Sequence, residues 1–431
     1  MRFSSLKNTQ AIYLLLFSFF IISLFAFVSC SSSEETTKII EQPVPEVKKE
    51  IVIPDFNKPI RVLISEKKNE NQVKFQNAAA IYSEGSLITK IKSKDKITFK
   101  LKNDKIVMSF GNKSFTRENF SILPIETDGT INFDAKKYSD SIRVTSNAGK
   151  ILIINYVSPD EYLTGVVASE MGNLSKKENI EALKAMMLCA KSFTFEKIKT
   201  AKPDYDVYSD IKDQLFNGVG NLNSTIREAY DSTKNLYLTF DDELVQVYYF
   251  SSCGGYTEDC KNVLPNCSSS YLSGVKDGEE PYCKISPSFN WQETITKKQM
   301  INSLVSAGYI EEGKWKIKEF SIQSRFVSGR ISELLVVVQS NDENRKEFIL
   351  SGNKIRYAIK TSDGAILKSA NFDIEAKYEN QELVAVKLKG KGNGHGVGLC
   401  QWGAIGMARQ GKKFDEIIAH YFNGIKITSK E

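Results

Sequence analysis

The chain has 431 residues, of which 41% are apolar and 26% are charged. This is the composition of a globular protein, and it excludes the fibrous and intrinsically disordered classes. The net charge of +6 is small and spread along the chain, so no basic stripe points to a nucleic-acid partner. The length allows two or three domains.

The N-terminus has the parts of a secretory signal peptide over residues 1–29. Arg2 and Lys7 precede a charge-free, mostly apolar run at 11–28, and a small residue comes before Cys30. A cysteine at this place resembles a bacterial lipoprotein processing site, so we expect a lipid on Cys30 and an exported, membrane-anchored protein. A retained anchor helix is the alternative, because about 18 apolar residues approach the minimum for a membrane span.

Two segments separate this signal from the candidate chemistry. Residues 30–59 contain four prolines among Glu and Lys with no period, which indicates a flexible linker after the lipidated cysteine. Residues 60–124 contain short β-type runs such as KITFKL and KIVMSF, separated by turn residues, and predict a small β domain. Every candidate site lies in the third region, 125–427.

The third region mixes strands and helices. After the strand-like ILIINYV, a Gly-containing segment ends in a lone acid, Glu170. Apolar residues three and four apart predict a helix near 178–198 with one buried stripe, and Lys184 and Lys191 lie two turns apart on a common face. A second helix is predicted near 401–422. Because helices and strands do not alternate regularly, we expect an α+β fold.

On pattern alone these charged residues have ordinary interpretations. A lone glutamate such as Glu170 most often caps a helix or interacts with its dipole. Lysines on one helix face, such as Lys184 and Lys191, usually form a solvated surface.

Read together, the motifs resemble the SpoIID/LytB family, peptidoglycan lytic transglycosylases first known from sporulation. The resemblance spans about residues 125–426, and five groups of motifs carry it in family order: EYLTGVVASEM; EALKAMMLCAKSF; YYFSSCGGYTE with YLSGVKDGEEPYCKISPSFNW; LKSANF; and GHGVGLCQWGAIGMARQGKKFDEIIAHYF. It implies a SpoIID-type catalytic domain over 125–427, preceded by the small β domain.

The resemblance implies cleavage of the MurNAc–GlcNAc bond of glycan strands without water, leaving a 1,6-anhydroMurNAc end. Glu170 matches the family's catalytic glutamate. One carboxyl group can suffice, because the sugar's own 6-hydroxyl is the nucleophile and the same glutamate serves as acid and then as base. Apolar neighbours such as Val166 and Met171 should raise the pKa of Glu170.

The resemblance also implies substrate-binding residues on the following helix. Lys184 matches a lysine that the family uses. Lys191 stands where the family has an arginine, and the change loses the planar fork that could hold a carboxylate at two points.

The two histidines of the chain, His395 and His420, lie close together near the C-terminus. His395 lies between glycines just before a helix, so with Gln401 and Trp402 it could seat a sugar that carries a lactyl carboxylate. The alternative is that the glycines permit tight packing and that His395 caps or hydrogen-bonds backbone. We expect His420 to be a helix-packing residue.

Four of the seven cysteines cluster within thirty-one residues: Cys253, Cys260, Cys267 and Cys283. Exported chains favour disulfides, so we expect disulfides here. The resemblance to related exported sequences favours the pair Cys253–Cys283. A four-thiolate zinc site is the alternative, although the spacing lacks CxxC knuckles. We expect no other cofactor.

Two functions remain open on the sequence. The first is a lytic transglycosylase that acts on peptidoglycan glycan strands. The second is a non-catalytic wall-binding lipoprotein that modulates an N-acetylmuramoyl-L-alanine amidase. Intact Glu170 and Lys184 favour the enzyme, and the lysine at position 191 favours the modulator.

Overall fold

The computed structural model describes residues 56–68, 70–74, 77–125, 129–379 and 382–429. The signal peptide, Cys30 and nearly all of the linker lie outside the described residues. Everything described belongs to one compact unit, Lys49–Glu431. Among the described residues, no helix combines the length and the apolar character that a membrane span requires.

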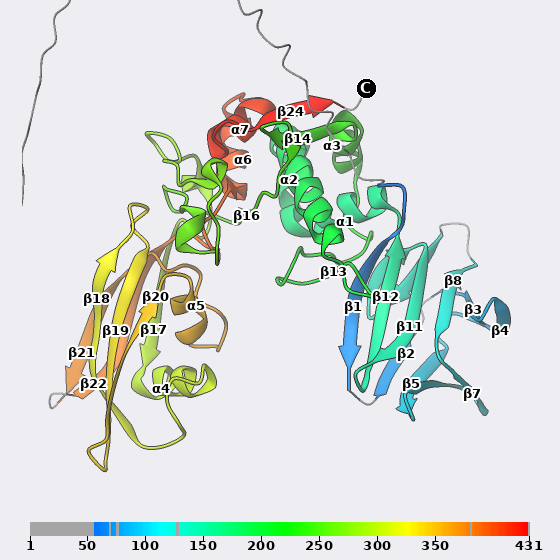
Figure 1. The fold of residues 1–431 in the computed structure, drawn as a ribbon, viewed down its shortest axis with the longest axis horizontal. Helices are drawn as coiled ribbons and strands as arrows, with labels where there is room; N and C mark the ends of the chain where they lie inside the picture. The colour runs from blue at the N-terminus through cyan, green and yellow to red at the C-terminus, as the bar shows by residue number, and fades with distance from the viewer. Residues whose placement is uncertain (1–55, 69, 75–76, 126–128, 380–381, 430–431) are drawn as a thin grey trace, which may run out of the picture. The chain divides into compact units, whose positions relative to one another are not determined.

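Two antiparallel-rich sheets form the N-terminal part (Figure 1). The larger has the order β13-β1-β12-β11-β8-β3-β4, and the smaller has the order β2-β5-β6-β7. Their strands, in chain order, are β1 (Ile60–Lys67), β2 (Glu70–Lys74), β3 (Ala79–Ser83), β4 (Ser86–Ile91), β5 (Lys96–Lys102), β6 (Lys105–Phe110), β7 (Lys113–Arg117), β8 (Phe120–Pro124), β11 (Ser141–Asn147), β12 (Lys150–Val157) and β13 (Val207–Tyr208). A hairpin of β9 (Thr130–Phe133) and β10 (Lys136–Ser139) accompanies them.

The larger sheet continues across residue 124, where the sequence placed a domain boundary. Strand β1 pairs antiparallel with β12 and parallel with β13. Strand β12, the predicted ILIINYV strand, is almost fully buried. The chain therefore passes directly from this sheet into the helix that carries the candidate acid, Glu170.

A group of helices from two parts of the chain packs together: α1 (Pro159–Met171), α2 (Ile180–Lys199), α3 (Ser224–Thr233), α6 (Gln401–Arg409) and α7 (Phe414–Tyr421). Helix α2 confirms the predicted helix, but it is buried at nearly every position from 182 to 195 rather than along one stripe. The reason is that α1, α3, α6 and α7 all pack around it. The Gly-containing segment that ends in Glu170 forms helix α1. The helix predicted near 401–422 is two helices that Gly411 (φ +86°) separates.

Short strands link the helices to the C-terminal part: β14 (Leu236–Phe240) with β15 (Glu243–Leu244) and β24 (Lys426–Ser429), and the parallel pair β16 (Tyr249–Phe250) and β23 (Leu399–Cys400). Two three-stranded sheets and two helices have their own apolar core. Their elements are β17 (Asn290–Thr296), α4 (Lys297–Ser306), β18 (Trp315–Arg325), β19 (Ile331–Ser340), β20 (Arg345–Ser351), α5 (Lys354–Ala358), β21 (Phe372–Glu379) and β22 (Glu382–Lys391). The fold is α+β, as predicted.

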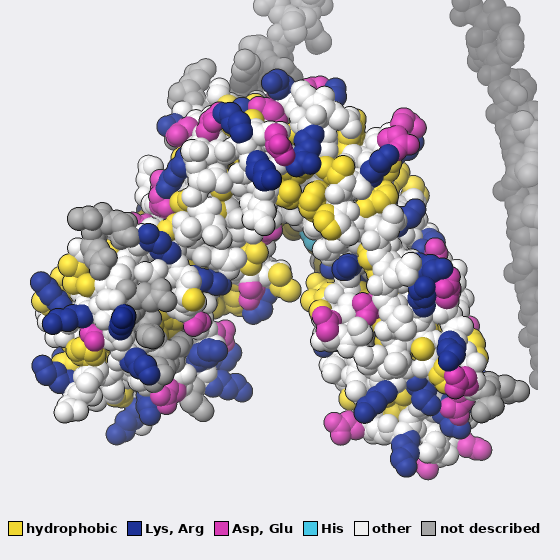
Figure 2. Space-filling model, turned by 180° about the vertical axis from the view of Figure 1, so that it is seen from behind, with side chains coloured by type: hydrophobic (Ala, Val, Ile, Leu, Met, Phe, Trp, Pro, Cys, Tyr) yellow, Lys and Arg dark blue, Asp and Glu magenta, His cyan; other side chains and the backbone are white. Residues whose placement is uncertain are grey.

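Charged side chains are distributed evenly over the visible face. Figure 2 shows lysine and arginine interspersed with aspartate and glutamate, as the spread of charge along the sequence indicates.

Candidate active site

Helix α1 presents Glu170 in its last turn. Pro159 occupies the first turn, where its fixed φ suits a helix and its missing N–H costs nothing, and Gly172 (φ +49°) ends the helix. Midway, Gly165 lies against the loop that follows β13: a Cβ there would come within 2.5 Å of the Phe216 ring. The absence of a side chain at Gly165 therefore lets that loop lie directly on α1, next to Glu170.

Three donors from separate parts of the chain surround the Glu170 carboxyl group. Its Oε1 accepts from the backbone N–H of Leu215 (2.9 Å) and from the Tyr249 hydroxyl (3.5 Å). Its Oε2 accepts from the Gln401 carboxamide (3.3 Å). Burial raises the pKa of Glu170, while the three donors lower it, and burial prevails. The group can therefore keep a proton to a higher pH than an exposed glutamate and release it to a positioned acceptor.

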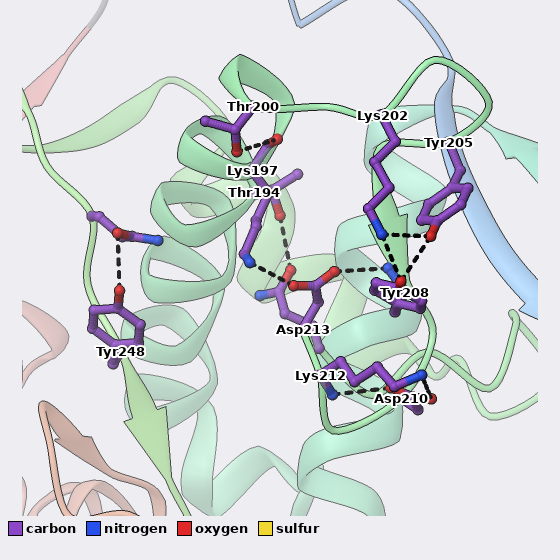
Figure 3. Close-up of polar contacts among 12 residues, drawn as sticks. Thr194, Lys197, Thr200, Lys202, Tyr205, Tyr208, Asp210, Lys212, Asp213 and Tyr248 are labelled. Carbon is purple, nitrogen blue, oxygen red and sulfur yellow. Dashed lines mark hydrogen bonds and ion pairs between the residues drawn. The ribbon is translucent and has the colours of Figure 1, made fainter. Parts of the chain in front are cut away.

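The loop that carries Leu215 is fixed by Asp213. One carboxylate oxygen of Asp213 pairs with Lys197 of α2 at 2.7 Å, and the other accepts from the backbone N–H of Tyr208 at 2.8 Å. Figure 3 shows Asp213 between these two partners, with the Tyr208 hydroxyl held in turn by Lys202 (2.7 Å). Asp213 is not among the residues expected from the sequence, because its partners lie on other elements.

Gln214 fixes the same loop from inside the core. It is 1% exposed, and its Oε1 accepts from the hydroxyls of Tyr162 (3.1 Å) and Thr194 (2.9 Å). Its Nε2 donates to the carbonyl of Ala190 (3.2 Å). The sequence signal that could have found both residues is the polar pair Asp213-Gln214 placed directly before the apolar Leu215-Phe216.

His395 hydrogen-bonds backbone on both sides of its ring. Nδ1 accepts from the N–H of Val397 (3.1 Å), so Nε2 carries the proton and donates to the carbonyl of Tyr249 (3.0 Å). Burial, with the nearby Arg356 charge, lowers the pKa of His395 to about 4, so the ring is neutral. This is the structural alternative considered from the sequence: His395 fixes the strand that carries Tyr249, and both nitrogens are occupied by protein.

The start of α6 brings another predicted residue to the acid. The Cys400 sulfur accepts from the N–H of Gly403 (3.3 Å) and caps the helix, which places Gln401 against Glu170. Trp402 is half-buried, and its backbone N–H donates to the carbonyl of Ser251 (3.0 Å). Of the predicted substrate-binding residues, Gln401 is thus the one seen in contact with Glu170.

Lys184 and Lys191 of α2 make their contacts away from Glu170. Lys184 pairs with Glu181 (2.9 Å) and lies over the Phe414 ring. Lys191 is 3% exposed and donates to the carbonyls of Thr233, Lys234 and Leu236 at 2.8–2.9 Å, at the end of α3. Burial lowers its pKa to about 7.

The shared helix face of the two lysines was predicted correctly, but surrounding helices cover it. In this geometry all three N–H donors of Lys191 are used by the protein, which does not fit the expected substrate contact. Substrate binding by Lys184 stays a prediction. His420 packs against the rings of Tyr282 and Tyr421.

The cysteines pair differently from the expectation. Cys260 and Cys267 form a disulfide. The favoured pair Cys253–Cys283 is not bonded: the sulfurs lie 3.3 Å apart, and both cysteines are free. The four-thiolate zinc site is not formed either, because Cys260 and Cys267 are bonded to each other. Spacing in the sequence could not reveal that Cys400 lies beside Cys253 and Cys283.

Comparison with known proteins agrees with the motifs. Residues 147–240, which include Glu170, match the SpoIID family, described as stage II sporulation protein. This part of the chain is a SpoIID domain. Two relatives from Bacillus subtilis are each 27% identical to this chain. The match to stage II sporulation protein D covers 63% of this chain and 75% of that protein. The match to an amidase enhancer covers 62% of this chain and 40% of the enhancer.

Two further matches extend this result. Residues 258–398 match a domain of unknown function, DUF8618. An uncharacterized protein of Brachyspira hyodysenteriae is 29% identical over 72% of this chain and 75% of its own length.

Proposed function

We propose that this protein is a peptidoglycan lytic transglycosylase in which Glu170 is both acid and base. The observation that carries the proposal is the state of this one carboxyl group. It is largely buried, its pKa is raised, and its three partners are a backbone N–H, a phenol and a carboxamide. A hydrolase would pair such an acid with a second carboxylate.

The reaction follows from these contacts. Protonated Glu170 gives its proton to the glycosidic oxygen as the MurNAc–GlcNAc bond breaks, and the carboxylate that results is stabilised by Leu215, Tyr249 and Gln401. The carboxylate then accepts the proton of the MurNAc 6-hydroxyl as that oxygen attacks C1. The acid is regenerated, and the sugar ends as the 1,6-anhydro form.

A second candidate is the modulation of a cell-wall amidase without catalysis. The observation that favours it is the amidase enhancer among the relatives, of which this chain covers 40%. Under either function, the N-terminal sequence leads us to propose export and attachment to a membrane through a lipid on Cys30.

The deciding experiment incubates the full-length protein, purified in detergent, with isolated glycan strands and measures product masses. Wild type should give 1,6-anhydro ends. Glu170→Gln keeps the shape but cannot transfer the proton, so turnover should fall by about 10²–10⁴-fold. Glu161→Gln is the matched control: Glu161 lies on the same helix, paired with Arg227, and its loss should leave turnover near wild type.

Three other outcomes would contradict the proposal. A product heavier by one water would indicate a hydrolase with another catalytic acid. Undiminished turnover in Glu170→Gln would refute the catalytic role of Glu170. Absence of cleavage by wild type, together with stimulation of an added amidase, would support the modulator.

A further inference from the structure

Four side chains with metal-binding atoms meet in the core beside the candidate active site. They are Cys253 after β16, Asp277, Cys283 in the short 3-10 turn Tyr282–Ile285, and Cys400 at the N-terminus of α6. Each is 0% exposed, and their ligand atoms all lie within 4.8 Å of one another. Three separate stretches of the chain thus converge on one point.

A disulfide joins only two sulfurs, so it cannot account for a cluster of three cysteines and an aspartate. The sulfurs of Cys253 and Cys283 are 3.3 Å apart, well beyond the disulfide bond length of about 2.05 Å. Sulfurs bound at about 2.3 Å around a tetrahedral ion lie about 3.75 Å apart, so a shift of about 0.5 Å would bring this pair to that separation. Even if this pair were oxidised, Cys400 and Asp277 would remain buried beside it, so only a shared ligand uses all four groups.

Backbone N–H groups are aimed at the sulfurs. Cys400 Sγ accepts from the N–H of Cys253 (3.2 Å) and of Gly403 (3.3 Å), and Cys253 Sγ accepts from the N–H of Gly255 (3.4 Å). Such donors stabilise thiolates, the form of cysteine that binds metals. Two of the three donors are glycines, which let the backbone come this close.

The Asp277 carboxylate is also held by hydrogen bonds in a tightly packed place. Asp277 accepts from the Tyr421 hydroxyl and from the N–H of Cys283 (2.8 Å), both neutral donors. A Cβ at Gly403 would lie 2.6 Å from the Asp277 carboxylate, so α6 can pack here only with glycine at this position. The buried guanidinium of Arg330 donates to the carbonyl of Cys253 (3.1 Å) and offsets part of the negative charge that three thiolates would bring.

We propose that Cys253, Asp277, Cys283 and Cys400 form a structural zinc site. Three thiolates and one carboxylate complete a tetrahedron of protein ligands and leave no open position for a substrate. This site shares two cysteines with the four-thiolate alternative considered from the sequence, but not the disulfide pair Cys260–Cys267.

The proposed zinc site lies close in sequence to two residues that contact Glu170. Cys253 lies four residues after Tyr249, and Cys400 directly precedes Gln401. Both Tyr249 and Gln401 donate to Glu170. A bound zinc ion would therefore hold together the two segments that position these donors.

The test measures metal and thiols in the full-length protein, purified anaerobically in detergent with zinc supplied during expression. We expect about one zinc ion per chain. Alkylation after denaturation should modify Cys253, Cys283 and Cys400. Replacement by Co²⁺ should give the sulfur-to-cobalt charge-transfer band and the visible bands of a tetrahedral thiolate site. Protein without zinc, or a cross-linked Cys253–Cys283 peptide, would overturn the proposal.

Variants assign the ligands. Cys400→Ser and Asp277→Asn should lose zinc or bind it more weakly. Two controls should keep it: Cys189→Ala, which removes a buried thiol within α2, and Cys260→Ser, which breaks the disulfide. Zinc lost in Cys260→Ser but kept in Cys400→Ser would contradict this ligand set. If Cys400→Ser does not fold, the cobalt spectrum of wild type still decides, and no readout depends on glycan cleavage.

Discussion

Replacing Gln401 by methionine should raise the pKa of Glu170 further above its ordinary value. The carboxamide donates to Oε2 of Glu170 over 3.3 Å, which stabilises the ionised form. Methionine keeps the length of the side chain but donates nothing. A hydrogen bond to a charged group is worth about 1.5–3 kcal/mol, and at this length we take about 1–1.5 kcal/mol. Since 1.36 kcal/mol corresponds to one pKa unit, the rise should be about 0.7–1.1 units.

The assay is the pH dependence of kcat/KM on purified glycan strands. The first step needs protonated Glu170, so the alkaline limb of the profile reports the pKa of this group in the free enzyme. In Gln401→Met the limb should move to higher pH. Tyr249→Phe should move it in the same direction but by less, because the hydroxyl lies 3.5 Å away. A limb that stays in place or moves to lower pH in both variants would refute the reasoning.

The remaining predictions concern stability, anchoring and the acid itself. Lys191→Met leaves three buried carbonyls without a donor, so it should lower the free energy of unfolding by about 2–4 kcal/mol in chemical denaturation. The control Lys199→Met removes an exposed partner of Glu196 and should change the free energy of unfolding by under about 0.5 kcal/mol. Equal effects would contradict the buried role. Cys30→Ser should abolish acylation, seen by mass, and unchanged membrane retention and mass would instead indicate an anchor helix. Glu170→Gln should lose the alkaline limb of any residual activity, and a preserved limb would assign it to another group.

Much of the fold could be predicted because its signals are local. Helix α2 was found from the spacing of its apolar residues, and strand β12 from the strand-like run ILIINYV. The spacing also placed Lys184 and Lys191 on one face correctly. It could not show which neighbours cover that face, because the other helices come from distant parts of the sequence. For that reason the expected substrate contact of Lys191 gave way to a buried contact with the end of α3.

The candidate site shows the same limit: its local features could be predicted from the sequence, but its long-range contacts could not. The motif located Glu170, and its apolar neighbours indicated the raised pKa. Its three donors come from positions 215, 249 and 401, so no local pattern joins them. The cysteines behave likewise: the pair Cys260–Cys267 is a local disulfide, whereas Cys400 reaches Cys253 only through the parallel pairing of β16 and β23.

The environment of Glu170, more than its presence, decides between the two proposed functions. Helix α1 and the Leu215 loop lie inside the range 147–240 that matches SpoIID, but Tyr249 and Gln401 lie outside both matched ranges. Burial alone would make Glu170 a poor acid in the first step, because the carboxylate that forms when it gives up its proton would be buried without a partner. The three donors offset part of this effect by stabilising the carboxylate, and so allow one group to serve in both steps. A relative that kept the glutamate and lost these donors would be expected to bind glycan without cleaving it.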